Sequence, residues 1–99
     1  MITEIAEIDV IAGQEAAFEA AVAAARPLFA AAAGCQGMEL QRSIEVPARY
    51  WLFVRWDDLD SHMVSFRQSP AFMTWRELVG PHFAAPPRVE HGVRVVRGL

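Results

Sequence analysis

The segment Arg49–Asp57, with the sequence RYWLFVRWD, constrains the fold of this chain more than any other part of it. Successive side chains of a β-strand point to opposite faces of its sheet. One face of this segment carries four large apolar or aromatic groups: Tyr50, Leu52, Val54 and Trp56. The other face places Trp51 and Phe53 between two arginines. A strand with apolar groups on both faces is predicted to lie inside a sheet that is covered on both sides.

The remaining pattern predicts the element order β-α-β-β-α-β. The predicted elements are strands over 2–11, 35–46, 49–56 and 88–96, and helices over 14–33 and 59–79. Pro27 lacks an amide donor, so a break in the first helix is expected there. Ser69-Pro70 is a typical helix start and divides the second helix in two. The order predicts a single α+β domain over residues 1–99, ferredoxin-like, with two helical segments on one face of an antiparallel four-stranded sheet.

The other face of that sheet has no helix to cover it. Leaving Trp51 and Phe53 in water would be unfavourable, since burial of one such side chain stabilises by about 2–3 kcal/mol. The chain is also 54% apolar, more than the thin core of a 99-residue domain requires. We therefore predict a homodimer in which Trp51 and Phe53 lie at the interface. The alternative is that these two side chains line an exposed binding surface.

Charge and composition exclude several classes of partner. The net charge is −3, all nine basic residues are scattered arginines, and no basic run is present, so nucleic-acid binding is not expected. No run of 18 apolar residues predicts a membrane span, and the acidic N-terminal stretch does not resemble a signal peptide. Cys35 is the single cysteine. A reduced, cytoplasmic location is the expectation.

Three short motifs carry a family resemblance. Their order and spacing resemble those of the antibiotic biosynthesis monooxygenase family. The motifs are Gly34-Cys35-Gln36-Gly37, Arg49-Tyr50-x-Leu52 with Trp56, and Ser69-x-x-Phe72. The resemblance implies a dimeric α+β barrel. Members that oxidise polycyclic phenols to quinones without a cofactor use an asparagine and a tryptophan near the substrate, but this chain contains no asparagine.

Haem-degrading members of the family use an iron-binding histidine on the helix after the Ser-x-x-Phe motif. This chain has Trp75 and Arg76 in that region, so haem breakdown is not expected. The fold alone does not identify the reaction.

His62 is the predicted catalytic residue. Helical spacing places it on one face with Leu59, Met63 and Phe66, toward the space between helix and sheet. A neutral imidazole there could act as a general base and take the proton of a phenol or quinol. The resulting phenolate can react with dioxygen without metal or flavin, so no cofactor is expected. The alternative is a buried histidine that is hydrogen-bonded to the backbone.

A ligand pocket is predicted around that histidine. The predicted pocket residues are Tyr50, Trp56, Phe66, Phe72, Trp75 and His91. One of Arg49, Arg67 and Arg76 could hold an anion, although a salt bridge is the alternative for each. The three histidines do not have the spacing of a metal-binding motif, so no metal site is predicted.

The predicted function is a cofactor-independent monooxygenase that acts on a small hydroxylated aromatic or a quinol. One alternative is a non-catalytic module that binds a small aromatic ligand. Another is an isomerase on the same dimeric barrel, which needs a base but consumes no oxygen. Oxygen consumption distinguishes the first hypothesis from the other two.

Overall fold

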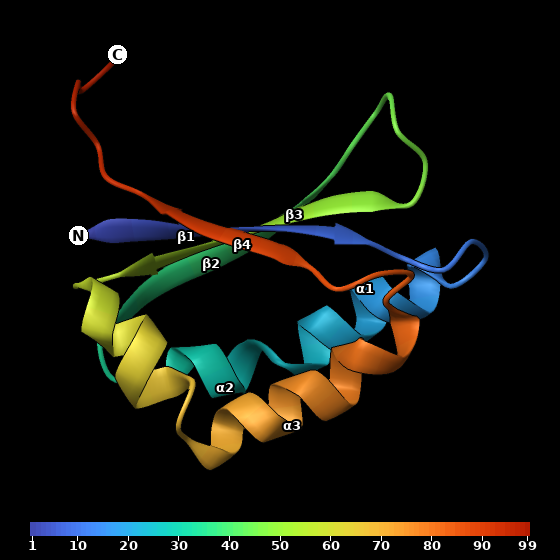
Figure 1. Cartoon of the computed structure of the whole chain (residues 1–99), viewed down its shortest axis with the longest axis horizontal. Helices are drawn as coiled ribbons and strands as arrows, with labels where there is room; N and C mark the ends of the chain where they lie inside the picture. Colours follow the sequence, from blue (N-terminus) through green and yellow to red (C-terminus); the bar gives the residue numbers. More distant parts are fainter.

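A computed structural model describes all 99 residues and shows one antiparallel sheet with every helix on the same side of it (Figure 1). The elements in chain order are β1 (Ile2–Asp9), α1 (Glu15–Ala24), α2 (Arg26–Ala30), β2 (Cys35–Arg42), β3 (Arg49–Trp56), the π-helical turn η1 (Ser61–Phe66), α3 (Pro70–Val79), the 3-10 turn η2 (Gly80–His82) and β4 (Arg88–Gly92). The strand order is β2-β3-β1-β4. The predicted ferredoxin-like fold is confirmed.

The two central strands supply most of the sheet side of the core. Tyr50, Leu52, Val54 and Trp56 of β3 are at most 2% exposed, whereas Trp51 and Phe53 on the opposite face are partly exposed. β1 pairs with β3 over its whole length, and its even-numbered residues from Glu4 to Val10 are buried on the same face as these β3 residues. The helix-facing side was therefore assigned correctly from the alternation in β3.

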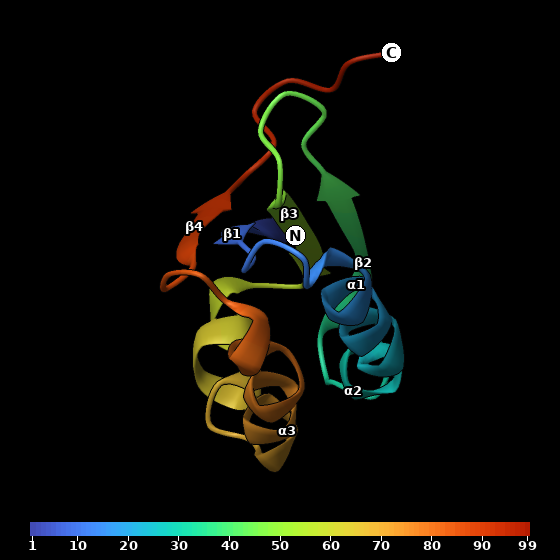
Figure 2. The same ribbon diagram turned by 90° about the vertical axis from the view of Figure 1, so that its right-hand side faces the viewer.

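The helices lie in two columns below the sheet. Figure 2 shows α1 and α2 under the β2 edge, and α3 under the β4 edge. The predicted break falls at Ala25, two residues before Pro27, because proline cannot continue the amide hydrogen bonds of the first helix. None of the helices combines the length and apolar character that a bilayer crossing requires.

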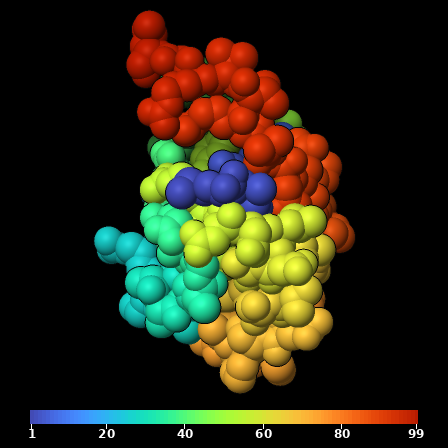
Figure 3. Space-filling view, turned by 90° about the vertical axis from the view of Figure 1, so that its left-hand side faces the viewer, coloured from blue at the N-terminus to red at the C-terminus, as the bar shows by residue number.

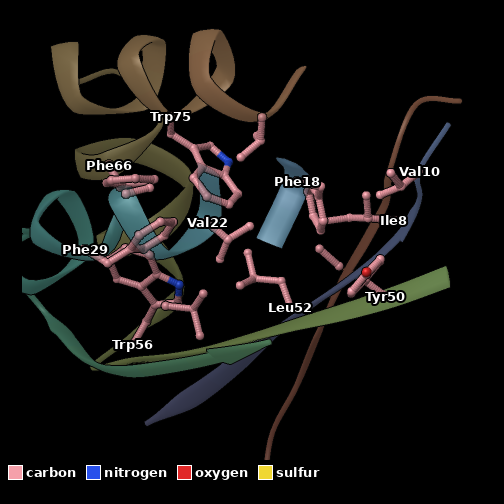
Figure 4. Close-up of a cluster of buried hydrophobic side chains, with 14 residues drawn as sticks. Ile8, Val10, Phe18, Val22, Phe29, Tyr50, Leu52, Trp56, Phe66 and Trp75 are labelled. Carbon is pink, nitrogen blue, oxygen red and sulfur yellow. The ribbon is translucent and has the colours of Figure 1, made fainter. Parts of the chain in front are cut away.

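The core has two aromatic ends, which Figure 4 shows on either side of Val22 and Leu52. At one end Phe29 lies 5.0 Å from both Phe66 and Trp75, measured between ring centroids. At the other end Tyr50 packs 4.9 Å from Phe18. Aromatic pairs at these separations add to the energy of area burial.

Two strands are shorter than the pattern predicted. β2 ends at Arg42 because the Ser43 hydroxyl accepts a hydrogen bond from the Val46 amide and closes a turn. β4 ends at Gly92, which pairs with Thr3 near the first residue of β1, so the following valines have no neighbouring strand to pair with. Those residues project from the molecule above its N-terminus (Figure 3).

Candidate functional site

A large cavity lies between β1, η1, α3 and the connector that leads into β4. Its volume is about 860 Å³, which is within the range of small-molecule sites. Its walls are mostly apolar and include Phe72, Trp75 and Phe83, together with two prolines of the connector. Four ionisable side chains also line it: Glu4, His62, Arg67 and Arg76.

Glu4 is the buried carboxyl of this cavity. β1 carries it on the helix-facing side, where it is 6% exposed. Its Oε1 atom accepts a hydrogen bond from Trp56 Nε1 at 3.0 Å and lies 3.3 Å from His62 Nε2. Its Oε2 atom has no hydrogen-bond partner in the chain and is not sealed from the surface. Burial raises the pKa of Glu4 to about 7, although the Trp56 hydrogen bond and the positive charge of Arg67 act in the opposite direction.

His62 joins that carboxyl to a second histidine. It is 3% exposed and stacks on Trp56, with ring centroids 5.4 Å apart and an interplanar angle of 15°. Its Nδ1 atom lies 2.8 Å from His91 Nε2. Burial lowers the pKa of His62 to about 4, and the neighbouring His91 and Arg67 lower it further. His62 is therefore neutral near pH 7, with one nitrogen donating a hydrogen bond and the other accepting one.

Glu4, His62 and His91 lie in a row: His62 Nε2 is 3.3 Å from Glu4 Oε1, and His62 Nδ1 is within hydrogen-bond distance of His91 Nε2. Glu4 and His91 are opposite each other in the β1–β4 pairing, and His62 lies between their side chains. A proton leaving the Glu4 carboxyl can reach His62 Nε2 while the Nδ1 proton of His62 passes to His91 Nε2. His91 is half-buried and does not line the cavity. A proton that reaches His91 has therefore left the space where a ligand would bind.

The π-helical turn explains how His62 points inward. The amide of Arg67 donates to the carbonyl of His62, five residues earlier, so the turn contains one more residue than an α-helical turn. Asp58 Oδ1 accepts from both the amide and the hydroxyl of Ser61 and holds the start of the turn. His62 and Phe66 are buried, but Leu59 and Met63 are 48% and 37% exposed. The prediction that Leu59 and Met63 share a buried face with His62 and Phe66 was wrong, because it assumed α-helical spacing. Single π-helical turns are frequent at functional sites.

The predicted pocket residues do not all lie in one place in the structure. Phe72 and Trp75 line the cavity together with His62. Trp56 and Phe66 lie in the core behind these residues, and His91 lies behind His62. Tyr50 differs most from the prediction, since it lies at the other end of β3 and its hydroxyl donates to Glu19 at 2.5 Å. The alternation along β3 correctly placed Tyr50 on the helix-facing side of the sheet. That side is longer than the cavity, so Tyr50 does not line it.

The three arginines that were predicted as possible anion-binding residues do not all lie at the cavity. Arg67 and Arg76 line the cavity, whereas Arg49 lies on the opposite face of the sheet and forms ion pairs with Asp9 and Glu7. No group of three or more histidine, cysteine, aspartate or glutamate side chains is arranged to hold a metal ion.

Sequence reasoning missed Glu4. The signal was present, because Glu4 is the single charged residue among the alternating positions Ile2, Glu4, Ala6, Ile8 and Val10. A lone carboxyl on an otherwise apolar strand face must be satisfied by hydrogen bonds or change its pKa, and both have occurred here.

Comparisons with known proteins agree with this architecture. A sequence model of the family described as antibiotic biosynthesis monooxygenase matches residues 1–78. A crystal structure from Bordetella bronchiseptica, of a protein assigned to these monooxygenases, is 58% identical with a TM-score of 0.94, covering 96% of this chain and 97% of that chain. The uncharacterized protein YczJ of Bacillus subtilis (strain 168) is 31% identical over 91 residues, which are 92% of this chain and 96% of that protein.

A more distant structure shares the fold alone. SnoaB, a cofactor-independent oxygenase from Streptomyces nogalater, is 22% identical with a TM-score of 0.75, covering 99% of this chain and 94% of that chain. The match of the family model over more than three-quarters of the sequence, on the fold described above, establishes that this chain belongs to the antibiotic biosynthesis monooxygenase family.

Proposed function

We propose that this protein is a monooxygenase that oxidises a small hydroxylated aromatic or a quinol without an organic cofactor, and that Glu4 removes the substrate's hydroxyl proton. The observation that carries the proposal is the state of the Glu4 carboxyl. Its Oε1 atom is fixed by Trp56 and His62, its Oε2 atom is free, and burial brings its pKa to about 7. A general base is most effective when its pKa is near the working pH.

His62 passes the proton on in this proposal. Its pKa of about 4 makes it a poor final acceptor at neutral pH. Its two ring nitrogens nevertheless contact Glu4 on one side and His91 on the other, so it can receive a proton at Nε2 and release one from Nδ1. This restores the Glu4 carboxylate for the next step. The general base predicted from sequence thus becomes a relay between the base and a more exposed histidine.

The proposed reaction balances without a further reductant. The phenolate left by proton removal supplies electrons to dioxygen, and a C–O bond forms at a ring carbon. The O–O bond then breaks. One oxygen atom stays on that carbon, as the second carbonyl of a quinone when the substrate is a phenol or as the hydroxyl of a hydroxyquinone when it is a quinol, and the other leaves as water with the two hydrogen atoms that the substrate has lost. Phe72 and Trp75 form apolar walls against which a planar ring can lie.

Oxygen uptake with a panel of phenols and hydroquinones tests the proposal. Wild type is expected to consume one dioxygen per quinone formed, above the rate of the uncatalysed reaction. Glu4→Gln keeps the size of the side chain but cannot accept the proton, so it should lower kcat at least about a hundredfold. Glu77→Gln, an exposed change on α3 outside the cavity, is the matched control and should retain the wild-type rate.

Other results would favour a different function. Binding of the panel without oxygen uptake would contradict the monooxygenase and support a ligand-binding module. Rearrangement of a substrate without oxygen uptake would support an isomerase that uses the same base. Full activity of Glu4→Gln would exclude Glu4 as the base.

The proposal includes a homodimer in the cytoplasm. Ile5, Trp51 and Phe53 form the apolar centre of the sheet face that no helix covers, and charged side chains such as Arg49 and Arg88 surround it. An apolar centre with a polar rim is the usual composition of a protein–protein interface. The single cysteine, Cys35, suits a reducing compartment.

A further inference from the structure

Two arginines line the cavity without a carboxylate partner. The ion pairs of the chain involve Arg42, Arg49 and Arg88, and neither Arg67 nor Arg76 takes part in one. The protein contact of the Arg67 guanidinium is a weak one, to the sulfur of Met63 at 3.8 Å. Guanidinium groups that line a ligand cavity and remain unpaired are available to an anion from outside the chain.

The two guanidinium groups contact the same aromatic ring although they come from different elements. Arg67 follows η1 and Arg76 lies in α3, yet their Cζ atoms lie 5.6 Å and 6.0 Å from the centroid of the same ring, that of Phe72. Stacking on an aromatic face holds a guanidinium group while leaving its N–H donors free. Phe72 therefore contacts both cations where they line the cavity.

The charge of the cavity is opposite to that of the whole chain. The chain has a net charge of −3, whereas the cavity contains two arginines and one carboxyl, Glu4, whose charge burial suppresses. A concave site of one sign with low-dielectric walls concentrates ligands of the other sign. The two arginines can therefore attract an anion into this cavity, although the net charge of the whole chain is negative.

We infer that the substrate is an aromatic carboxylate, held through its carboxylate by Arg67 and Arg76 while its ring lies against Phe72 and Trp75. This inference rests on the proposed function and adds the class of substrate to it. A carboxylate matches the planar fork of a guanidinium with two parallel hydrogen bonds.

Calorimetric titration under nitrogen with a matched pair of probes tests this inference without turnover. The probes are 6-hydroxy-2-naphthoate and its uncharged carboxamide, which share the ring and the hydroxyl. Wild type is expected to bind the carboxylate at least about tenfold more tightly, since hydrogen bonds between a guanidinium and a carboxylate are stronger than those to a neutral amide. R67Q/R76Q should remove that preference and leave the carboxamide affinity within about twofold.

R26Q is the matched control. Arg26 is exposed at the start of α2, outside the cavity, and its replacement should leave both affinities unchanged. Equal wild-type affinity for the two probes, equal weakening of both by R67Q/R76Q, or binding of neither probe at millimolar concentration would overturn the inference.

The two proposals can fail separately. Arginine-dependent binding of the naphthoate without oxygen uptake from any substrate would retain the carboxylate site and reject the monooxygenase. Oxidation of uncharged hydroquinones at the same rate by wild type and R67Q/R76Q, without preference for the naphthoate, would retain the monooxygenase and reject the carboxylate site.

Discussion

At the scale of single residues, Glu4 and His62 are two buried groups whose burial has opposite consequences. Each is less than a tenth exposed, so the charged form of each is unfavourable. The pKa of Glu4 is raised to about 7 and that of His62 is lowered to about 4. Between about pH 4 and 7 the pair therefore carries little charge, although it consists of an acid and a base 3.3 Å apart. Such a pair can exchange a proton without a large change in solvation.

The opposite shifts predict a characteristic dependence of stability on pH. Between about pH 4.5 and 7 folded Glu4 retains a proton that the unfolded chain has released, so this group lowers the free energy of unfolding as pH rises. Between about pH 4 and 6.5 the unfolded chain holds a proton on His62 that the folded chain does not. His62 therefore raises the free energy of unfolding as pH rises. Each contribution is on the order of 3 kcal/mol, and in wild type the two nearly cancel from about pH 4.5 to 6.5.

Single substitutions should separate these contributions in urea unfolding measured across that pH range. H62Q leaves Glu4 alone, so its free energy of unfolding should fall with rising pH relative to wild type. E4Q leaves His62 alone, so its free energy of unfolding should rise. E77Q serves as the control and should follow the wild-type curve. Parallel curves for all four proteins would contradict the burial-driven shifts described here.

Sequence reasoning located His62 and placed His91 and Trp56 near it, but it missed Glu4. An isolated histidine on a helix with apolar neighbours is visible in the sequence, and so is a lone charge on an apolar strand face, although only the first was recognised as a candidate. The contact between His62 and His91 depends on the register of β4 against β1, which joins residues more than eighty positions apart along the chain. No local pattern specifies such a register.

At the scale of elements, the turn η1 is positioned by Gly34. This glycine has φ +83°, and a side-chain carbon added to it would collide with Ser61, the first residue of η1. The amide of Asp57, at the end of β3, also donates to the Gly34 carbonyl at 2.8 Å. The loop before β2 therefore packs directly against the turn that carries His62.

Replacing glycine with alanine at two positions measures this contact. Gly13 has φ +92° but no atom within 4 Å of an added carbon, so G13A should cost only the backbone strain, about 1–2 kcal/mol. G34A should cost about 1–3 kcal/mol more, because it adds a collision to the same strain. Denaturant unfolding of both variants, and of G34A in an S61G background where the collision is relieved, gives the difference. Equal costs for G13A and G34A would show that the approach of Gly34 to Ser61 is not tight.

The elements themselves could largely be predicted from sequence, because alternation and helical spacing are local. Pro27 and Ser69-Pro70 marked the two helix interruptions at the correct positions. Ser69 nevertheless does not cap α3, since its hydroxyl donates to the Phe66 carbonyl at 2.6 Å. The extra residue of the π-helical turn could not be predicted, because the apolar spacing of this segment also fits an α-helix.

At the scale of the whole molecule, the sheet separates two environments. The helix-covered face holds the core and the cavity, and the open face presents Trp51 and Phe53 on β3. Figure 1 shows that no helix lies above that face. The proposed dimer would bury these two aromatic side chains in both protomers, because a symmetric interface uses the same surface of each copy.

A charge placed on the open face should therefore prevent dimerisation. F53E is expected to raise the dissociation constant of the dimer at least about a hundredfold, since it removes apolar burial from both protomers and adds an unpaired charge. M73E is the control, because Met73 is an exposed apolar residue of α3, on the helical side. Sedimentation velocity over a range of concentrations measures the effect. Dimers of unchanged stability in F53E would place the interface elsewhere.

The most direct test of the account is a titration of the Glu4 carboxyl itself. Carbon-13 NMR of protein labelled at the glutamate carboxyl carbon resolves the individual side chains, and E4Q identifies the Glu4 signal by its loss. Burial of Glu4 predicts a midpoint of about pH 7 for its signal, with a second, smaller change in the same signal when His62 is protonated near pH 4. A midpoint near the ordinary value of 4.5 would show a solvated carboxylate and would contradict Glu4 as the base.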